Sequence, residues 1–337
     1  MTPINWGVLS TAKIGVVKVI PAMQQGKGGR ILGLASRDRA RAAEVAAKLG
    51  IPKSYGSYEA LLADPEIDAV YNPLPNHLHV PWTLKALAAG KHVLCEKPIA
   101  LNAAEAGTLI RARDASGRQV LEAFMVRQHP QWLRARELVR AGRIGALRAI
   151  STVFAYHNVD PANVRNQADI GGGGLYDIGC YAVVTARFIM EAEPTRVVAT
   201  IERDPNFRTD RLSSALMDFP GGRQVTFTCS TQMVPYQRVQ IFGTTGRIEV
   251  AIPFNAPPDR PCRITVDGGA ADGSKAEVEE FPVCDQYTFQ GEEAARIFKG
   301  EIAAPFPIED AVANMVVIDA LFKSAETGAW IVLARAG

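Results

Sequence analysis

Short apolar runs alternate with helical patterns over roughly the first 125 residues of this chain. Strands that are apolar throughout and joined by helices are typical of a parallel sheet covered on both faces. The sequence therefore predicts an α/β domain at residues 1–125. Its five expected strands are Ile4–Leu9, Ile31–Ala35, Ile67–Tyr71, Lys91–Cys95 and Gln119–Ala123.

Helical patterns fill the gaps between these strands. Segments 39–49 and 79–89 each end at a glycine, and Asn102 is a favourable N-cap for a helix that runs to about Ser116. The first helix begins near Lys13 and contains Pro21. Because proline has no backbone N–H, we expect a break or kink there.

The pattern changes after Gly145. In Gln224–Ser230 the apolar residues Val225, Phe227 and Cys229 alternate with polar ones, which predicts an antiparallel sheet with one buried and one polar face. Segments 196–202 and 238–242 resemble further strands, and two helices at about 287–298 and 308–325 finish the chain. We therefore predict a second domain at 126–337, with last helices that are free to pack on either domain. The stretch 253–274, rich in Gly, Pro and Asp, is expected to be a surface excursion.

Composition excludes several classes of protein. Apolar residues make up 47% and charged residues 21%, which is ordinary for globular domains. The 37 basic and 35 acidic residues are mixed along the chain, so no nucleic-acid partner is expected. No apolar run reaches the length of a membrane span, and the N-terminus does not resemble a secretion signal. Five widely spaced cysteines without a C-x-x-C pair indicate reduced thiols in a cytoplasmic protein.

The turn after the first strand is a candidate phosphate-binding turn. Dinucleotide-binding folds place G-x-G-x-x-G there, and this chain has Ser10–Gly15 with the letters STAKIG. Serine and alanine replace two glycines, but both are small enough for a phosphate to approach the helix N-terminus. An ordinary strand–helix turn is an equally good interpretation of this segment alone.

The end of the second strand bears on the choice of cofactor. NAD-binding folds often place an acid there, but this chain has Ser36. Arg37 and Arg41 follow, and their guanidinium groups suit the 2′-phosphate of NADP. The pattern favours NADP, while Asp38 leaves use of both cofactors open. The alternative is that these arginines form a solvated first helical turn.

Two motifs follow the third and fourth strands: NPLPNHLH at 72–79 and CEKP at 95–98. The carboxyl ends of parallel strands form the ligand edge of such sheets. A lysine there, Lys97, can polarise a substrate oxygen, although Lys-Pro also occurs in ordinary turns. His77 and His79 have no acid or cysteine at metal-ligand spacing, so no metal is expected. His79 is expected to open the next helix and to help place Asn76.

A four-glycine run at 171–174 leads into LYDIGCY at 175–181. Glycines let a chain pass close to a ligand, and on a helix Asp177 and Tyr181 share one face. A free tyrosine has a pKa of about 10, which a nearby lysine and oxidised cofactor would lower. Asp177 would oppose that shift or orient the substrate. The alternative is a half-buried structural tyrosine and a helix-end charge.

Taken together, these motifs resemble the glucose–fructose oxidoreductase / inositol dehydrogenase family (Gfo/Idh/MocA) over nearly the whole chain. The resemblance rests on WGVLSTAKIG, YNPLPNHLH, CEKP, GGGGLYDIGCY and IFGTTGRIEV. Tyr181, where many members have histidine, and EAFMVRQHPQ at 122–131 are most similar to the branch that includes glucose–fructose oxidoreductase, D-xylose dehydrogenase and trans-dihydrodiol dehydrogenase.

The resemblance implies an N-terminal Rossmann domain and a C-terminal α+β domain with a large, mostly antiparallel, open-faced sheet. By the same resemblance, Lys97 contacts nicotinamide and substrate, Tyr181 is the acid/base, and Asp177 binds a substrate hydroxyl. Arg127 and Arg165 are expected near the pocket, where they would bind cofactor or substrate; for Arg165, a surface charge is the alternative. The cofactor residues implied are Ser10, Thr11, Ala12, Lys13, Ile14, Ser36, Arg37, Arg41, Leu74, Asn76, His79, Glu96 and Lys97.

The expected activity is hydride transfer between NADP, or NAD, and a sugar or cyclic polyol. The sequence does not separate an aldose from a keto-sugar, a dihydrodiol or a nucleotide-linked sugar. A non-catalytic, cofactor-binding regulatory protein is the alternative. The polar face formed by Gln224, Thr226, Thr228 and Ser230 is expected to make a homodimer or homotetramer contact, with a solvated face as the alternative.

Overall fold

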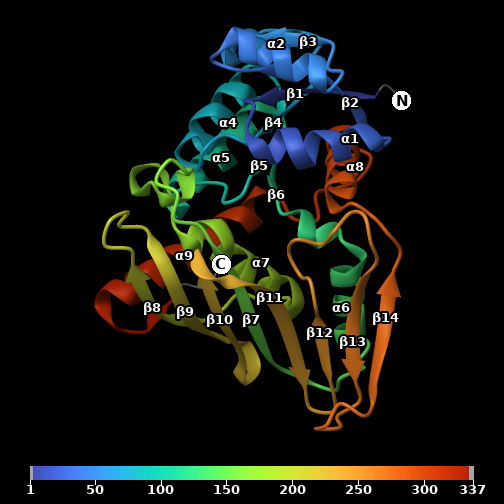
Figure 1. Ribbon diagram of the computed structural model, residues 1–337, viewed down its shortest axis with the longest axis vertical. Helices are drawn as coiled ribbons and strands as arrows, with labels where there is room; N and C mark the ends of the chain where they lie inside the picture. Colours follow the sequence, from blue (N-terminus) through green and yellow to red (C-terminus); the bar gives the residue numbers. More distant parts are fainter. Residues whose placement is uncertain (1–2, 334–337) are drawn as a thin grey trace. The chain divides into compact units, whose positions relative to one another are not determined.

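The computed structural model describes residues 3–333 and divides into two compact units (Figure 1). Among these residues, the first unit contains 3–125 and 286–315, and the second contains 126–285 and 316–333. The chain thus passes between the units after residues 125, 285 and 315.

A parallel sheet forms the centre of the first unit, as predicted, with six strands among the described residues in the order β3-β2-β1-β4-β5-β6. The short edge strand β3 was not predicted from the sequence. The strands are β1 (Ile4–Leu9), β2 (Gly29–Ala35), β3 (Lys53–Tyr55), β4 (Ala69–Asn72), β5 (His92–Glu96) and β6 (Val120–Ala123).

The helices of this unit follow the predicted segments, apart from α3, which was missed. As predicted, Asn102 caps α5, and its side chain accepts a hydrogen bond from Glu105 N at 2.8 Å. At Pro21 the helix does not break; a wide π-helical turn, Gly15–Val19, directly precedes α1. The helices are α1 (Ile20–Gln25), α2 (Arg39–Lys48), α3 (Tyr58–Leu62), α4 (His79–Ala88), α5 (Ala103–Ser116) and α8 (Gln286–Phe298).

The late helix α8 completes the core of the first unit. Phe298 lies 5.5 Å from the Trp6 ring and stacks on His92 at 4.8 Å, measured between ring centroids. Ala294 and Ala295 are buried in the same cluster as the first strands. Thr288 also donates to the Ala22 carbonyl at 2.9 Å. The hydrophobic core of this unit is therefore built from its early strands and from the much later helix α8.

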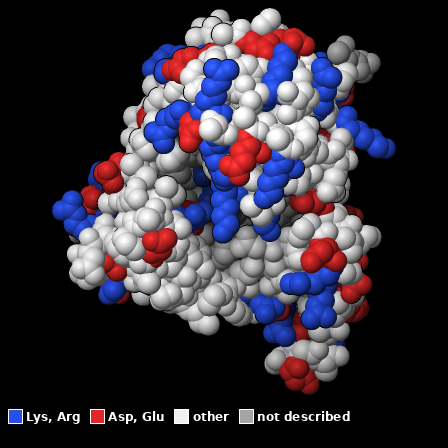
Figure 2. Space-filling model, turned by 45° about the horizontal axis from the view of Figure 1, so that its top comes forward, with Lys and Arg blue, Asp and Glu red and all other residues white. Residues whose placement is uncertain are grey.

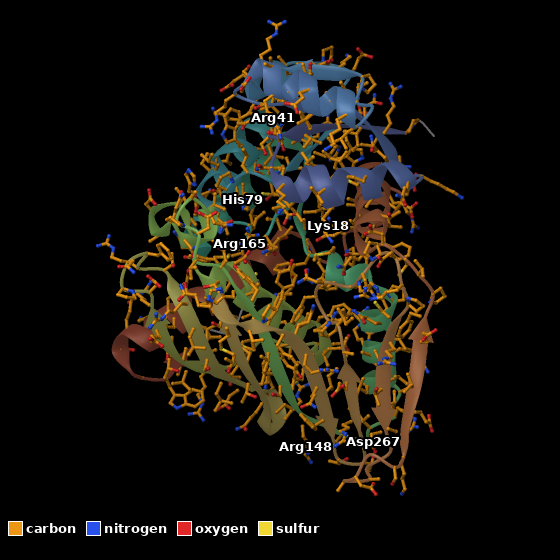
Figure 3. All side chains as sticks on the ribbon, viewed as in Figure 1. Lys18, Arg41, His79, Arg148, Arg165 and Asp267 are labelled. Carbon is orange, nitrogen blue, oxygen red and sulfur yellow. The ribbon has the colours of Figure 1, made fainter. Side chains whose placement is uncertain are left out.

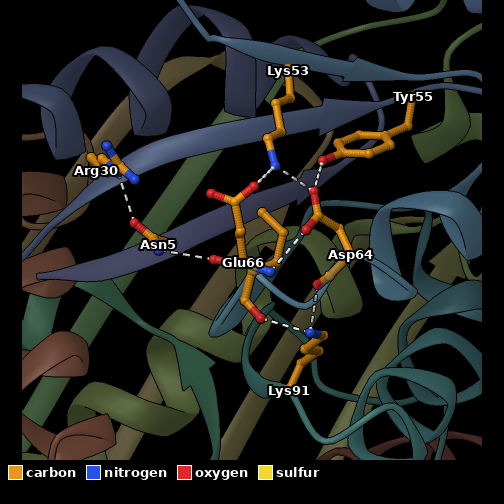
Figure 4. A network of polar contacts seen from close by, with 8 residues as sticks. Asn5, Arg30, Lys53, Tyr55, Asp64, Glu66 and Lys91 are labelled. Carbon is orange, nitrogen blue, oxygen red and sulfur yellow. Dashed lines mark hydrogen bonds and ion pairs between the residues drawn. The ribbon is translucent and has the colours of Figure 1, made fainter.

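A polar network fixes edge strand β3 to the segment before β4 (Figure 4). Lys53 pairs with Asp64 and Glu66, and Tyr55 donates to Asp64 at 2.5 Å. The Lys53 and Tyr55 hydrogen bonds lower the pKa of Asp64 to about 2. Lys91 closes the network by donating to the Asp64 and Ile67 carbonyls at 2.8 and 2.7 Å.

A mostly antiparallel sheet forms the second unit, as predicted. In the described part of the chain it has nine strands in the order β14-β13-β12-β11-β7-β10-β9-β8-β15, and the single parallel pair is β7–β10. The strands are β7 (Leu147–His157), β8 (Arg196–Arg203), β9 (Asp210–Phe219), β10 (Arg223–Ser230), β11 (Gln232–Gly243), β12 (Arg247–Val250), β13 (Cys262–Asp267), β14 (Ala276–Phe281) and β15 (Ile331–Val332).

Helices α6 (Pro130–Arg140) and α7 (Cys180–Met190) cover one face of this sheet, and the other face is open in Figure 1. Val225, Phe227 and Cys229 are buried on the covered side, which confirms the predicted alternation. Ser230 is buried as well, against the prediction, because its hydroxyl donates to the Arg211 carbonyl at 2.6 Å.

The prediction that 253–274 is a surface excursion is wrong. Phe254 is fully buried, because it stacks on Phe154 at a centroid distance of 4.6 Å. Strand β13 lies within this stretch and pairs with both of its sheet neighbours. Helix α9 (Ile308–Thr327) follows α8 and contains the last passage between the units.

Charged side chains of both signs are interspersed over the face shown in Figure 2. This agrees with the nearly equal numbers of basic and acidic residues in the sequence. None of the described helices combines the length and the apolar character that crossing a bilayer requires.

Candidate active site

The turn after β1 keeps a glycine-like backbone although its first residue is a serine. Ser10 has a φ of 90°, in the left-handed region that favours glycine. Its N–H donates to the Ala35 carbonyl at 2.9 Å, and its hydroxyl accepts from Ala12 N at 3.2 Å. The first N–H groups of the following helix have no partner within that helix, which suits an anion. The turn around Thr11, Lys13 and Ile14 therefore fits a dinucleotide pyrophosphate.

At the end of β2, Asp38 is occupied by the helix that it begins. Its carboxylate accepts from Arg41 N at 3.1 Å as the N-cap of α2, and its own N–H donates to Ser36 at 3.2 Å. Arg37 hydrogen-bonds to the Tyr58 hydroxyl. The Arg41 side chain, which is labelled in Figure 3, pairs through its guanidinium with Glu44 at 2.9 Å. The end of β2 thus carries two arginines, and Asp38, the acid beside them in this described segment, is engaged as an N-cap.

His79 links the segments that follow β4 and β5. It opens α4, as predicted, and its buried ring lies 2.7 Å from both the Leu74 and the Pro98 carbonyls. Burial lowers its pKa to about 4, so the ring is neutral at pH 7 and donates to one of the two. The Asn72 side-chain amide supports the same link, because it donates to the His79 backbone carbonyl at 3.1 Å. The short helix Asn76–Leu78 directly precedes α4.

Lys97 follows β5 directly and is partly exposed. The preceding Glu96 accepts a hydrogen bond from the Tyr71 hydroxyl at 2.7 Å, and the Lys97–Pro98 peptide is cis. Ile99 N donates to Glu122 at 2.8 Å. Because β1, β4 and β5 are adjacent parallel strands, their following loops lie at one edge of the sheet. Lys97 is therefore held at the same edge as the Ser10 turn.

In the second unit, the glycine run lets the chain pack closely against its own groups. A Cβ on Gly172 would lie 2.6 Å from the Gln167 carbonyl, and one on Gly173 would lie 1.9 Å from Asp210 Oδ1. Directly after the run, the π-helical turn Leu175–Gly179 leads without a break into α7. The glycines were expected to serve a ligand; their close contacts in the structure are internal.

Asp177 is held by two donors on its Oδ2 atom. The Tyr156 hydroxyl donates at 2.6 Å and Arg165 Nε donates at 2.8 Å. Burial and the carboxylate raise the pKa of Tyr156, and the carboxylate raises the pKa of Arg165, so both remain protonated. The Arg165 side chain is 43% exposed and that of Asp177 14%, so solvent reaches the ion pair mainly from the arginine side.

Tyr181 lies one helical turn beyond Asp177, and its side chain is mostly buried in an aromatic cluster. Phe154 meets its ring edge-on at 5.9 Å, and Phe254 lies tilted at 5.4 Å. Such contacts restrict the plane of the ring. The predicted pair of carboxylate and phenol therefore lies on one continuous helix.

The structure thus collects the expected site residues into two groups. Asp177, Tyr181 and Arg165 are close together in the second unit, whereas Lys97 and the expected cofactor residues belong to the first. Arg127 is buried in a short helix, Met125–Gln128, at the start of the second unit. Sequence reasoning missed Tyr156, since a single tyrosine on a strand carries no motif.

Known proteins match the chain along most of its length. A model described as "Oxidoreductase family, NAD-binding Rossmann fold" matches residues 4–124, and the GFO/IDH/MocA C-terminal domain matches 132–249. An oxidoreductase of Rhizobium meliloti is 46% identical, covering 98% of this chain and 99% of its own. The D-xylose 1-dehydrogenase (NADP(+)) 2 of Haloferax volcanii is 40% identical, covering 97% and 99%.

The chain belongs to the GFO/IDH/MocA family of oxidoreductases. Among solved structures, a 3-ketoreductase from Actinomadura kijaniata in complex with NADP and TDP-benzene has a TM-score of 0.90 and 28% identity, covering 96% of this chain and 98% of its own. Family membership confirms the predicted fold class and identifies the first unit as an NAD(P)-binding Rossmann domain.

Proposed function

We propose that this GFO/IDH/MocA oxidoreductase transfers hydride between NADP and a carbinol carbon of a sugar or cyclic diol. The observation that carries the proposal is the Asp177–Tyr181 pair. A phenol and a carboxylate lie one turn apart, and Tyr156 and Arg165 already fix the carboxylate. Such a pair suits a substrate with adjacent hydroxyls, because one can exchange a proton while the other donates a hydrogen bond.

The roles follow from the chemistry of the side chains. When bound, NADP⁺ supplies the hydride acceptor. Tyr181 takes the hydroxyl proton as the carbon loses its hydrogen and two electrons, and it returns that proton in the reverse reaction. Lys97, at the cofactor edge of the first unit, would supply a positive charge that stabilises the substrate oxygen. Asp177 accepts a hydrogen bond from a second hydroxyl, and Arg165 holds that carboxylate in place through its ion pair.

The proposed preference for NADP rests on the end of β2. Asp38 is engaged as the α2 N-cap, whereas Arg37 and Arg41 bring positive charge to the same place. Exposed ion pairs contribute little stability, so Arg41 can leave Glu44 at little cost. It can then form a charge-assisted hydrogen bond with a 2′-phosphate. Comparing kcat/KM for NADP⁺ and NAD⁺ measures the preference directly.

A spectrophotometric screen at about 340 nm against aldoses, inositols and dihydrodiols tests the activity. On the substrate that turns over, Lys97→Met is expected to lower kcat at least about 100-fold while leaving folding intact. Lys85→Met is the matched control, since Lys85 lies over the Trp82 ring on the outer side of α4. Undiminished turnover in Lys97→Met would remove this lysine from the mechanism. NADPH binding without turnover of any substrate would favour the regulatory alternative.

We also propose that the chain forms a homodimer or homotetramer through the open face of its second sheet. Val198, Ser214, Leu216, Thr226 and Thr228 line a shallow groove there with short, uncharged side chains. A shallow, uncharged surface of this kind can pair with a second copy of itself about a twofold axis. Light scattering of the purified chain tests this, and Thr226→Arg is expected to give a monomer.

A further inference from the structure

Asp210, the first residue of β9, reaches the start of the helix that carries Asp177 and Tyr181. Its side chain is buried, with 1% of the residue exposed. Its Oδ2 atom accepts a hydrogen bond from Leu175 N at 2.5 Å and one from Ser213 Oγ at 3.3 Å. The residues before Leu175 are glycines, which have no side chain to cap a helix. A carboxylate from a distant strand therefore supplies the missing cap.

The glycine run is shaped around this carboxylate. Gly173 has a φ of 125°, and a Cβ there would lie 1.9 Å from Asp210 Oδ1. A Cβ on Gly174 would lie 3.4 Å from Oδ2. The backbone of the glycine run thus packs directly against the carboxylate, and the Leu175 N–H is held by it.

We propose that Asp210 is a positioning residue, whose ionised carboxylate fixes the start of the helix so that Asp177 and Tyr181 are presented to the substrate. The inference rests on the proposed function of those two residues. The π-helical turn at Leu175 continues into α7 without a break, so a shift at Leu175 displaces both. Asp210 itself touches neither reacting group in this scheme.

The charge on Asp210 is sensitive to pH. Burial raises the pKa of this carboxyl to about 6, against the hydrogen bond from Leu175. The titratable and charged groups around it are Arg203, which pairs with it in the register of β8 and β9, Cys229 on β10, Tyr156 on β7 and Asp177 on the helix itself. Asp210 is therefore ionised at pH 7.5 and neutral well below pH 6, where the cap weakens.

Kinetics in the direction of carbonyl reduction isolate this effect. Tyr181 is the proposed proton donor in that direction, so acid conditions keep it in the form that the reaction needs. We expect wild-type kcat to fall below about pH 6. In Asp210→Asn, kcat at pH 7.5 should be about 10- to 100-fold lower than in the wild-type enzyme, and KM should be nearly unchanged. The kcat of this variant should not decrease further below pH 6.

Asp204→Asn is the matched control. Asp204 is buried on the same β8–β9 connection and accepts from the Asn206 and Phe207 N–H groups at 2.8 and 2.9 Å, away from the helix. It should lose stability while keeping the wild-type kcat and pH profile. The proposal is overturned if Asp210→Asn has the wild-type kcat and the same decrease in kcat below pH 6. It is also overturned if Asp204→Asn loses as much kcat at pH 7.5 as Asp210→Asn does.

Amide hydrogen exchange at Leu175 gives a readout that does not need turnover. Protection should be lost in Asp210→Ala, which has no capping acceptor, and reduced in Asp210→Asn and in the wild-type protein below pH 6, where the acceptor is uncharged, but kept in Asp204→Asn at pH 7.5. Full protection in Asp210→Ala overturns the capping role. If no substrate is turned over by any form while exchange behaves as expected, the proposed function fails and the positioning of the helix by Asp210 stands.

Discussion

Individual side chains of the candidate site differ in how visible they are in the sequence. Lys97, Asp177 and Tyr181 lie in motifs whose letters and spacing carry meaning, so they could be singled out beforehand. Tyr156 and Asp210 could not, since each reaches Asp177 or Leu175 across more than twenty positions of sequence. Their roles arise from the pairing of strands, which local patterns do not contain.

Gly173→Ala tests the most constrained backbone position of this site. The added methyl group would meet the Asp210 carboxylate, and the φ of 125° is unfavourable for alanine. We expect the free energy of unfolding to fall by at least about 1–3 kcal/mol, with loss of turnover. Gly221→Ala is the control, because it also has a positive φ but nothing within 4 Å of the added atom. Equal effects of the two changes on turnover would contradict this reading.

At the level of strands and helices, sequence patterns located the buried elements best. β1, β4 and β5 are buried along almost their whole length and were recognised from their apolar runs, whereas the edge strand β3 has only three residues, none fully buried. The long central strand β7 was missed, because Ile150 and Phe154 on its buried face alternate with Val153 on the open one. The exposed β14, with its three glutamates, carries no apolar pattern at all.

The N-cap of α6 makes the stability of the fold sensitive to acid. His129 Nδ1 accepts from Gln131 N at 3.2 Å, and burial lowers the pKa of this fully buried ring to about 4. Since an unfolded histidine has a pKa of about 6.5, the unfolded chain binds more protons between these values. The His129 contribution is therefore complete above pH 6.5 and declines as the pH falls towards 4.

His129→Asn keeps a capping acceptor and removes this titration. Urea unfolding at pH 7.5 and 5.0 should show a decrease in stability that is smaller by about 1–2 kcal/mol in the variant than in the wild-type protein. His79 and His92, whose pKa values burial also lowers to about 4, remain in both proteins and contribute to the rest of the decrease. An identical decrease in both proteins would show that His129 does not titrate on unfolding.

At the scale of the whole molecule, the division of the chain was only partly visible in the sequence. The change of pattern near residue 125 marked the first passage between the units, and the last helices were left free to pack on either one. Helical periodicity shows that α8 has an apolar face but not what covers it. The contact of Phe298 with Trp6 settles that question.

Residues 3–125 alone are therefore expected to fold poorly, because Trp6 and His92 lose the ring that covers them. Joining 286–315 to this fragment through a flexible linker should restore a cooperative thermal transition and NADPH binding. Circular dichroism and NADPH fluorescence of both fragments measure this. A cooperative transition of equal midpoint without 286–315 would show that α8 is dispensable to this core.

The return of α8 to the first unit also limits how genes of this kind can be recombined. A single crossover near codon 125, joining the first half of one gene to the second half of another, would give the Trp6 core a foreign Phe298 partner. A viable hybrid would need a second crossover that brings the α8 of the first parent along with its first domain. Alternatively, the second parent would need an α8 that closely matches that of the first. Cofactor use and substrate range are therefore expected to be inherited together.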